Sequence, residues 1–262
     1  MKLDDILSHD ARNRLRDHLI EDYLDEASTF LATVFADDPM LADATTRRDL
    51  ARACLDHAQR LGIRRRNQHL DYAALAVRCG IGLEWNPLFR HHLDRAGWLD
   101  GQGQLTHVPD TGALGPFAAQ WCQMAVLECQ MPDVALSACL EAAERGGVAG
   151  RAPLLALLHA AWPDRTAIVP PRDLEAFADL VLDNITRRQM PDDVAALFAV
   201  LSLHLGAFFF RDPRYTGLID AFADQQAGDE ARSRAAARVI RVIWDGAATQ
   251  QGDGLEGEGR HG

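Results

Sequence analysis

Five polar residues could meet in a site that does chemistry: Arg65, Asp71, Arg188, Asp193 and His204. They come from two similar stretches of the sequence, so a cleft between those stretches could bring them together. His204 lies inside an apolar segment, where a buried imidazole needs a hydrogen-bonding partner. The set allows two interpretations, an enzyme with a site in this cleft or a surface that binds a partner.

The cysteine and histidine spacings do not predict a metal site. Cys54 and His57 are three residues apart and so share one helix face, but no second pair completes the four ligands that zinc requires. His91 and His92 are adjacent, so on a helix their side chains point about 100° apart and cannot readily bind one ion. We therefore predict no metal and no cofactor.

The sequence also lacks the common catalytic motifs. It contains no Gly-x-x-x-x-Gly-Lys loop, no Gly-x-Gly-x-x-Gly after a strand and no Gly-x-Ser-x-Gly elbow. These absences reduce the expectation of an enzyme without excluding one. We assign no catalytic residue from the sequence.

Composition and charge narrow the class of protein. The 262 residues are 48% hydrophobic and carry a net charge of −11, which argues against nucleic acid and is compatible with a basic protein partner. The first residues are acidic and show no signal peptide, and no run of about 18 apolar residues predicts a membrane span. The five cysteines are an odd number in helical segments. We expect reduced thiols and a cytoplasmic protein.

Apolar residues recur three and four positions apart along most of the chain, which predicts helices. In 11–24, for example, Leu15, Leu19 and Tyr23 form one stripe. Gly62 follows the last apolar position of another helix, and we expect it in a left-handed conformation just after the helix end.

One module occurs twice, at 48–97 and at 172–224. Each copy reads as a helix, a basic turn, an apolar helix, and a corner in which an aromatic residue precedes proline. We expect the aromatic to pack into the angle between the helices. From the Ala-Ala-Leu motif to the proline, the second copy is longer by about one helical turn. The corner residues are Trp85 and Pro87 in the first copy and Phe210 and Pro213 in the second.

Glycine and proline interrupt the helical pattern between the copies, so we expect a boundary there. The predicted fold class is all-α, a multi-helix array in which two related helical units flank a middle helical segment. The predicted parts are an N-terminal unit at 1–97, an irregular loop at 98–116, a C-terminal unit at 117–245 and a disordered tail at 246–262.

The turn at Gly62–Ile63, with its arginines at 64–66 and the apolar helix that follows, resembles helical accessory proteins encoded beside type VI secretion effectors. The corner from Gly206 to Pro213 is similar to that family's Gly-x-x-Phe-x-x-x-Pro corner, whereas the first copy has Trp85 and Asn86 where an acidic residue is expected. The resemblance leaves 97–171 outside it. It implies an adaptor, chaperone or immunity factor and transfers no functional residue.

The leading interpretation is a non-enzymatic, cytoplasmic helical protein that binds a protein partner, such as a secreted effector or toxin. It depends on the duplication, the acidic charge, the missing motifs and the resemblance. The alternatives are an enzyme with a site in the cleft between the copies and an oligomeric scaffold. The scaffold predicts a large apolar surface patch.

Overall fold

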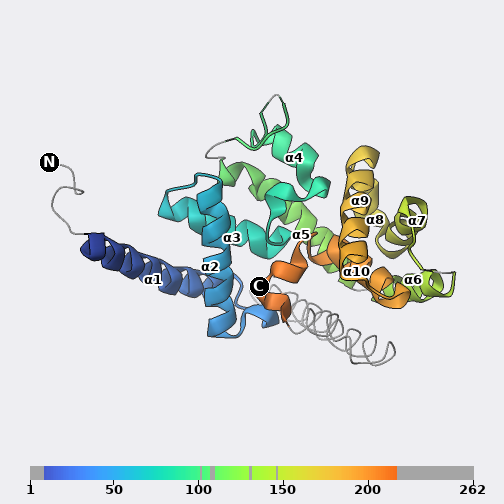
Figure 1. Cartoon of the computed structure of the whole chain (residues 1–262), viewed down its shortest axis with the longest axis horizontal. Helices are drawn as coiled ribbons and strands as arrows, with labels where there is room; N and C mark the ends of the chain where they lie inside the picture. The colour runs from blue at the N-terminus through green and yellow to red at the C-terminus, as the bar shows by residue number, and fades with distance from the viewer. Residues whose placement is uncertain (1–8, 101, 107–109, 130–131, 146, 217–262) are drawn as a thin grey trace, which may run out of the picture.

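The computed structural model describes residues 9–100, 102–106, 110–129, 132–145 and 147–216. In these ranges the regular elements are helices, apart from one antiparallel bridge between Leu99 and Leu105 (Figure 1). The predicted all-α class is confirmed. The α-helices are α1 His9–Val34, α2 Ala44–Arg60, α3 Arg66–Cys79, α4 Arg90–Arg95, α5 Gly115–Cys129, α6 Pro132–Glu144, α7 Arg151–Ala161, α8 Pro163–Ile168, α9 Pro171–Arg188 and α10 Asp192–Leu205.

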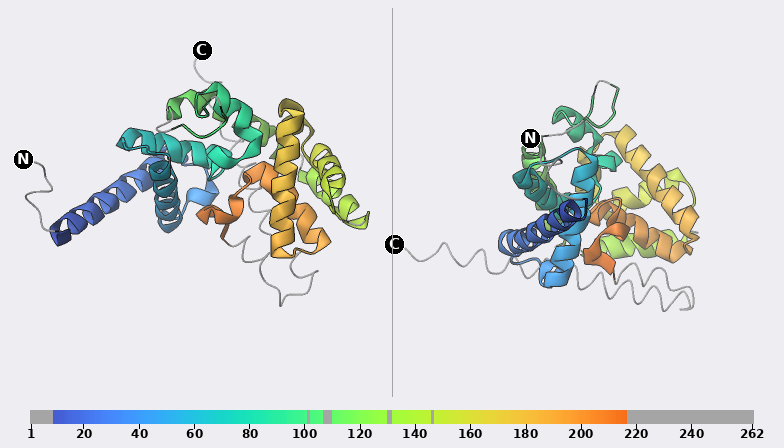
Figure 2. Two further views of the ribbon diagram at one scale, coloured as in Figure 1. Left: turned by 45° about the horizontal axis from the view of Figure 1, so that its top comes forward. Right: turned by 60° about the vertical axis from the view of Figure 1, so that its left-hand side comes forward.

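Helix α1 packs on α2 and α3 with its second half, while its first half projects from the rest of the molecule (Figures 1 and 2). The apolar stripe expected at 11–24 is therefore buried at one end and exposed at the other. Tyr23 is buried, but Leu15 and Leu19 are 41% and 55% exposed because no described helix covers them. The spacing of apolar residues predicted helix α1 correctly. It predicted the buried face only for the second half of α1, which packs on α2 and α3.

In each copy a turn with a left-handed residue precedes the central helix, which is α3 in the first copy and α10 in the second. Gly62 has φ +75° and Ile63 donates to the Ala58 carbonyl across 2.9 Å, the bond expected at a left-handed helix end. In the second copy Gln189 takes the left-handed place with φ +51°. Arg188 is the last residue of α9, so the second copy has no separate basic turn.

The central helices α3 and α10 are each 14 residues long and begin at Arg66 and Asp192, 126 residues apart. Each ends at a glycine, followed by two short 3-10 turns, and the second turn of each pair begins at proline. These turns are η3 Leu83–Trp85, η4 Pro87–Phe89, η6 Phe209–Arg211 and η7 Pro213–Tyr215. The predicted one-turn difference is therefore wrong: Leu75 corresponds to Leu201, not to Leu197.

The two corners pack back to back through glycine. Gly80 has φ +86°, and a Cβ built on it would lie 2.5 Å from the Leu205 carbonyl oxygen. Gly206 has φ +105°, and its Cβ would lie 2.9 Å from the Cys79 carbonyl oxygen. Only glycine permits these backbones to approach so closely. In addition, η4 packs on α9 and η7 packs on α2, so each corner lies against a helix of the other copy.

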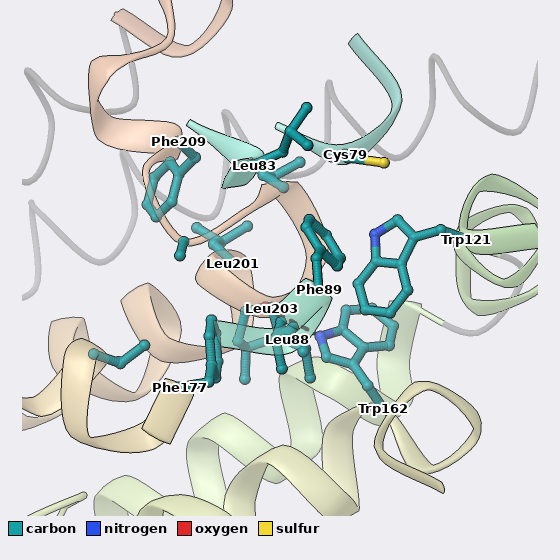
Figure 3. Packing of buried hydrophobic residues seen from close by; sticks show 14 of the residues in the cluster. Cys79, Leu83, Leu88, Phe89, Trp121, Trp162, Phe177, Leu201, Leu203 and Phe209 are labelled. Carbon is teal, nitrogen blue, oxygen red and sulfur yellow. Dashed lines mark hydrogen bonds between the residues drawn. The ribbon is translucent and has the colours of Figure 1, made fainter. Parts of the chain in front are cut away.

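A continuous hydrophobic core joins the two copies. Leu83 and Phe89 from the first corner meet Leu201 and Phe209 from the second, beside Trp121 (Figure 3). The segment predicted as a boundary loop at 98–116 supplies the buried Trp98 and Leu114 to the same cluster, and its end forms η5 Thr111–Leu114 and the start of α5. The core therefore crosses the predicted boundary.

Two buried arginines donate hydrogen bonds to backbone carbonyls at the ends of α3 and α10. Arg214 donates to the Val77 carbonyl of α3 across 2.9 Å, and Arg165 donates to the Leu203 carbonyl of α10 across 3.0 Å. Val77 and Leu203 are themselves 126 residues apart, so the same place is capped in both copies. A guanidinium satisfies carbonyls that the end of a helix leaves without an intrahelical partner.

The end of the second copy beyond 216, the rest of the C-terminal unit to 245 and the tail at 246–262 lie outside the described residues.

Candidate functional site

The residues predicted to converge lie at separate places. Arg65 is exposed before α3, and Asp71 is exposed on α3, where it accepts a hydrogen bond from the Thr111 hydroxyl across 3.2 Å. Arg188 lies over the Phe210 ring, 4.4 Å from its centroid. In the described part of the chain, no hydrogen bond or ion pair joins Arg65, Asp71 and Arg188 to one another.

His204 is partly buried, and its imidazole stacks on the Trp162 ring with centroids 5.0 Å apart. Burial, reinforced by the nearby Arg165, holds the pKa of His204 well below its usual value. The ring is therefore neutral at physiological pH and serves as an apolar stacking surface. The side chain of Asp193 lies outside the described residues.

A polar network does occur, at His57. Its Nδ1 lies 3.0 Å from Glu84 Oε1, and the Tyr72 hydroxyl donates to Glu84 Oε2 across 2.6 Å. The Glu84 side chain is fully buried, and burial together with this carboxylate raises the pKa of Tyr72. His57 is therefore grouped with the carboxylate of Glu84 in η3 and the phenol of Tyr72 in α3. The spacing in the sequence related His57 only to Cys54.

The network lies directly beneath an exposed tryptophan. The Trp85 ring packs on His57 with centroids 5.1 Å apart, yet Trp85 is 42% exposed. The expectation that Trp85 fills the angle between helices is therefore wrong, and Leu83 is the residue of this turn that packs in the core. Phe210 packs partly buried against Phe198. The prolines Pro87 and Pro213 start η4 and η7 as predicted.

We expect Glu84→Ala to destabilise the protein by about 2–4 kcal/mol, because it leaves the buried Tyr72 hydroxyl and His57 without their acceptor. Urea unfolding followed by circular dichroism measures the change. Glu175→Ala, on the exposed side of α9, is the matched control and should leave the midpoint unchanged. Equal midpoints for the two variants would contradict a structural role for the network.

A cleft lies beside Trp85, between the first corner and α9. We define it by two adjoining cavities of about 490 and 570 Å³, which share Arg90, Leu99 and Gly103. Its walls are η3, η4 and α4 on one side, residues 99, 100 and 103–105 on another, and Pro170–Ala176 at the start of α9 on the third. A cleft between the copies therefore exists, with different residues from those predicted.

The two cavities differ in chemistry. Trp85, Pro87, Leu93 and Leu105 line the smaller cavity, which therefore offers apolar surface. Charged side chains line the larger one, and they are Arg90, His91, Asp94, Asp100, Arg172 and Asp173. A cleft with an aromatic rim and charged groups at one end suits a polypeptide segment that carries both apolar and charged side chains.

Sequence reasoning missed Glu84 and Asp173 as site residues. Glu84 had one usable signal, because it is a single carboxylate among apolar residues at 81–88. Asp173 lies at the start of the second copy, and a position in the first turn of a helix is ordinary for an acidic residue.

Within the described residues, no three His, Cys, Asp or Glu side chains come together in a way that could hold a metal ion. Cys54, Cys79, Cys122 and Cys139 are free, and burial raises the pKa of Cys139 to about 12. None of the described helices is long and apolar enough to cross a membrane. No family model, curated protein or solved structure matches the chain.

Proposed function

We propose that this protein binds a segment of a protein partner in the cleft, with Trp85 as the central contact. The observation that carries the proposal is a tryptophan 42% exposed on the rim of a cavity, above a buried polar network that holds its position. Tryptophan is among the residues that contribute most to binding energy at protein interfaces. A rigidly supported indole also loses little conformational freedom on binding.

The acidic charge and the resemblance to secretion-associated accessory proteins support a cytoplasmic adaptor, chaperone or immunity role for this binding. A net charge of −11 speeds encounter with a basic partner. The partner proposed is a secreted effector or toxin.

Trp85→Ala should weaken partner binding by about 2 kcal/mol, roughly 30-fold, because it removes the exposed contact. The fold should persist, since the indole is nearly half exposed. The partner is first identified by placing a photo-cross-linking phenylalanine analogue at position 85 in the native host. Isothermal titration with the purified partner then compares wild type and Trp85→Ala.

The matched control carries the same cross-linker at Val34, which is 46% exposed at the end of α1, away from the cleft. An adduct with one protein at position 85 and not at position 34 supports the proposal. If position 85 gives no adduct in cells that also make the neighbouring gene products, the proposal fails. An adduct between two copies of this chain favours the oligomeric scaffold instead.

A further inference from the structure

Asp173 is a buried carboxylate that lines the larger cavity of the cleft. It lies in the first turn of α9 and is 8% exposed. Within the described part of the chain, its side chain has no hydrogen bond and no ion pair. Asp212, which is 1% exposed, accepts hydrogen bonds from Arg214 on both carboxylate oxygens. Asp173 therefore differs from the other buried aspartate in lacking a partner.

A carboxylate that faces a cavity and has no hydrogen bond from the protein is free to accept one from a donor that enters the cavity. The cations around the cavity do not take up this acceptor. Arg90 uses its guanidinium on the Gly103 carbonyl across 3.3 Å, and Arg172 follows the exposed side of α9. His91 lines the same wall, and His92 nearby stacks on the Phe117 ring at 3.9 Å. None of these groups forms a hydrogen bond or an ion pair with Asp173, although the Asp173 carboxylate acts electrostatically on His92.

Two further carboxylates, Asp94 and Asp100, line the same cavity. The Oδ1 atom of Asp100 already accepts from the backbone of Gln102 and Gln104, whereas Asp94 is exposed at the rim. Because Asp173 is buried in the wall of the cavity and lacks a donor, the group that best satisfies it is a cation with several N–H donors.

We propose that the larger cavity receives an arginine or lysine side chain of the partner, and that Asp173 accepts its hydrogen bonds. This inference rests on the proposed function, because it assumes that the cleft binds a polypeptide. The cation would supply the partner that Asp173 lacks in the free protein. The negative net charge of the chain favours the approach of such a basic segment.

The test uses the full chain and small probes, so it does not require the partner. N-acetyl-arginine amide is titrated against ¹⁵N-labelled protein, with N-acetyl-citrulline amide as a neutral probe of the same shape. Arginine amide should shift the backbone amides of 172–176, and citrulline amide should bind at least tenfold more weakly, because it lacks the charge that strengthens these hydrogen bonds.

Asp173→Asn keeps the shape of the side chain and removes its charge, so it should reduce the affinity for arginine amide at least tenfold. Asp164→Asn, exposed on α8, is the matched control and should bind as wild type does. The inference is overturned if citrulline amide binds as well as arginine amide, or if a folded Asp173→Asn binds arginine amide unchanged. Preferential binding of N-acetyl-aspartate amide, drawn by Arg90 and Arg172, also overturns it.

The two proposals can fail separately. If cross-linking at Trp85 captures a partner but arginine amide does not bind, the cleft binds a polypeptide without a basic side chain in the larger cavity. If arginine amide binds at Asp173 but Trp85 captures nothing, the cation site exists and the protein-binding function fails.

Discussion

Gly80→Ala should lower the free energy of unfolding by about 3–5 kcal/mol, at the upper end for single substitutions. The new methyl group would lie 2.5 Å from the Leu205 carbonyl oxygen, and both groups belong to backbone that cannot rotate away. The φ of +86° with ψ 153° lies in a region of backbone conformation that essentially only glycine adopts, so a residue with a Cβ atom is strained there. Urea unfolding monitored by circular dichroism gives the free energy.

Gly150→Ala separates the two contributions. Gly150 has φ +100° and ψ 164°, close to the 86° and 153° of Gly80, but a Cβ built there would meet no atom within 4 Å. It should therefore cost only the backbone strain, about 1–3 kcal/mol. Equal losses for the two variants would show that the close approach of the two corners contributes nothing to stability.

Arg214→Met should destabilise the protein by about 3–5 kcal/mol, because it leaves the buried Asp212 carboxylate without its cation. The guanidinium donates to Asp212 and to the Ala76 and Val77 carbonyls at the end of α3. Burial alone would lower the pKa of Arg214, but the Asp212 carboxylate raises it on balance, so the pair stays ionised. Urea unfolding again provides the measurement.

A second variant identifies the cause of this loss. Adding Asp212→Asn to Arg214→Met removes the uncompensated charge, and the side-chain oxygen can still accept from the backbone N–H of residue 214. The double variant should therefore recover part of the lost stability. If the double variant unfolds at the same urea concentration as Arg214→Met, the stability is lost through the missing hydrogen bonds to α3 and not through the unpaired Asp212 carboxylate.

The helices could be predicted from the sequence because each depends on local spacing and on signals at its ends. Gly62 adopts the expected left-handed conformation, and Pro87 and Pro213 start the expected turns. The register of the two copies could not be predicted in the same way. The short Ala-Ala-Leu motif suggested Leu197 as the counterpart of Leu75, but the turn at Gln189 fixes where α10 begins.

The site was less predictable because its geometry depends on residues far apart in the sequence. His57 meets Glu84 across 27 positions, and the cleft brings Arg90 beside Asp173. A helical pattern shows which face of a helix is apolar, but it does not show which other helix will cover that face. For the same reason Trp85, expected inside a corner, lies on the rim of the cleft.

The back-to-back glycines at 80 and 206 have a consequence for how the chain folds. Because each corner rests on a helix of the other copy, neither copy can complete its core alone. During synthesis, the first copy must wait with apolar surface uncovered until residues near 215 leave the ribosome. Contacts so distant in sequence slow the folding rate more than they reduce the final stability, because closing a longer loop adds little entropy cost. The two copies therefore form one cooperative folding unit.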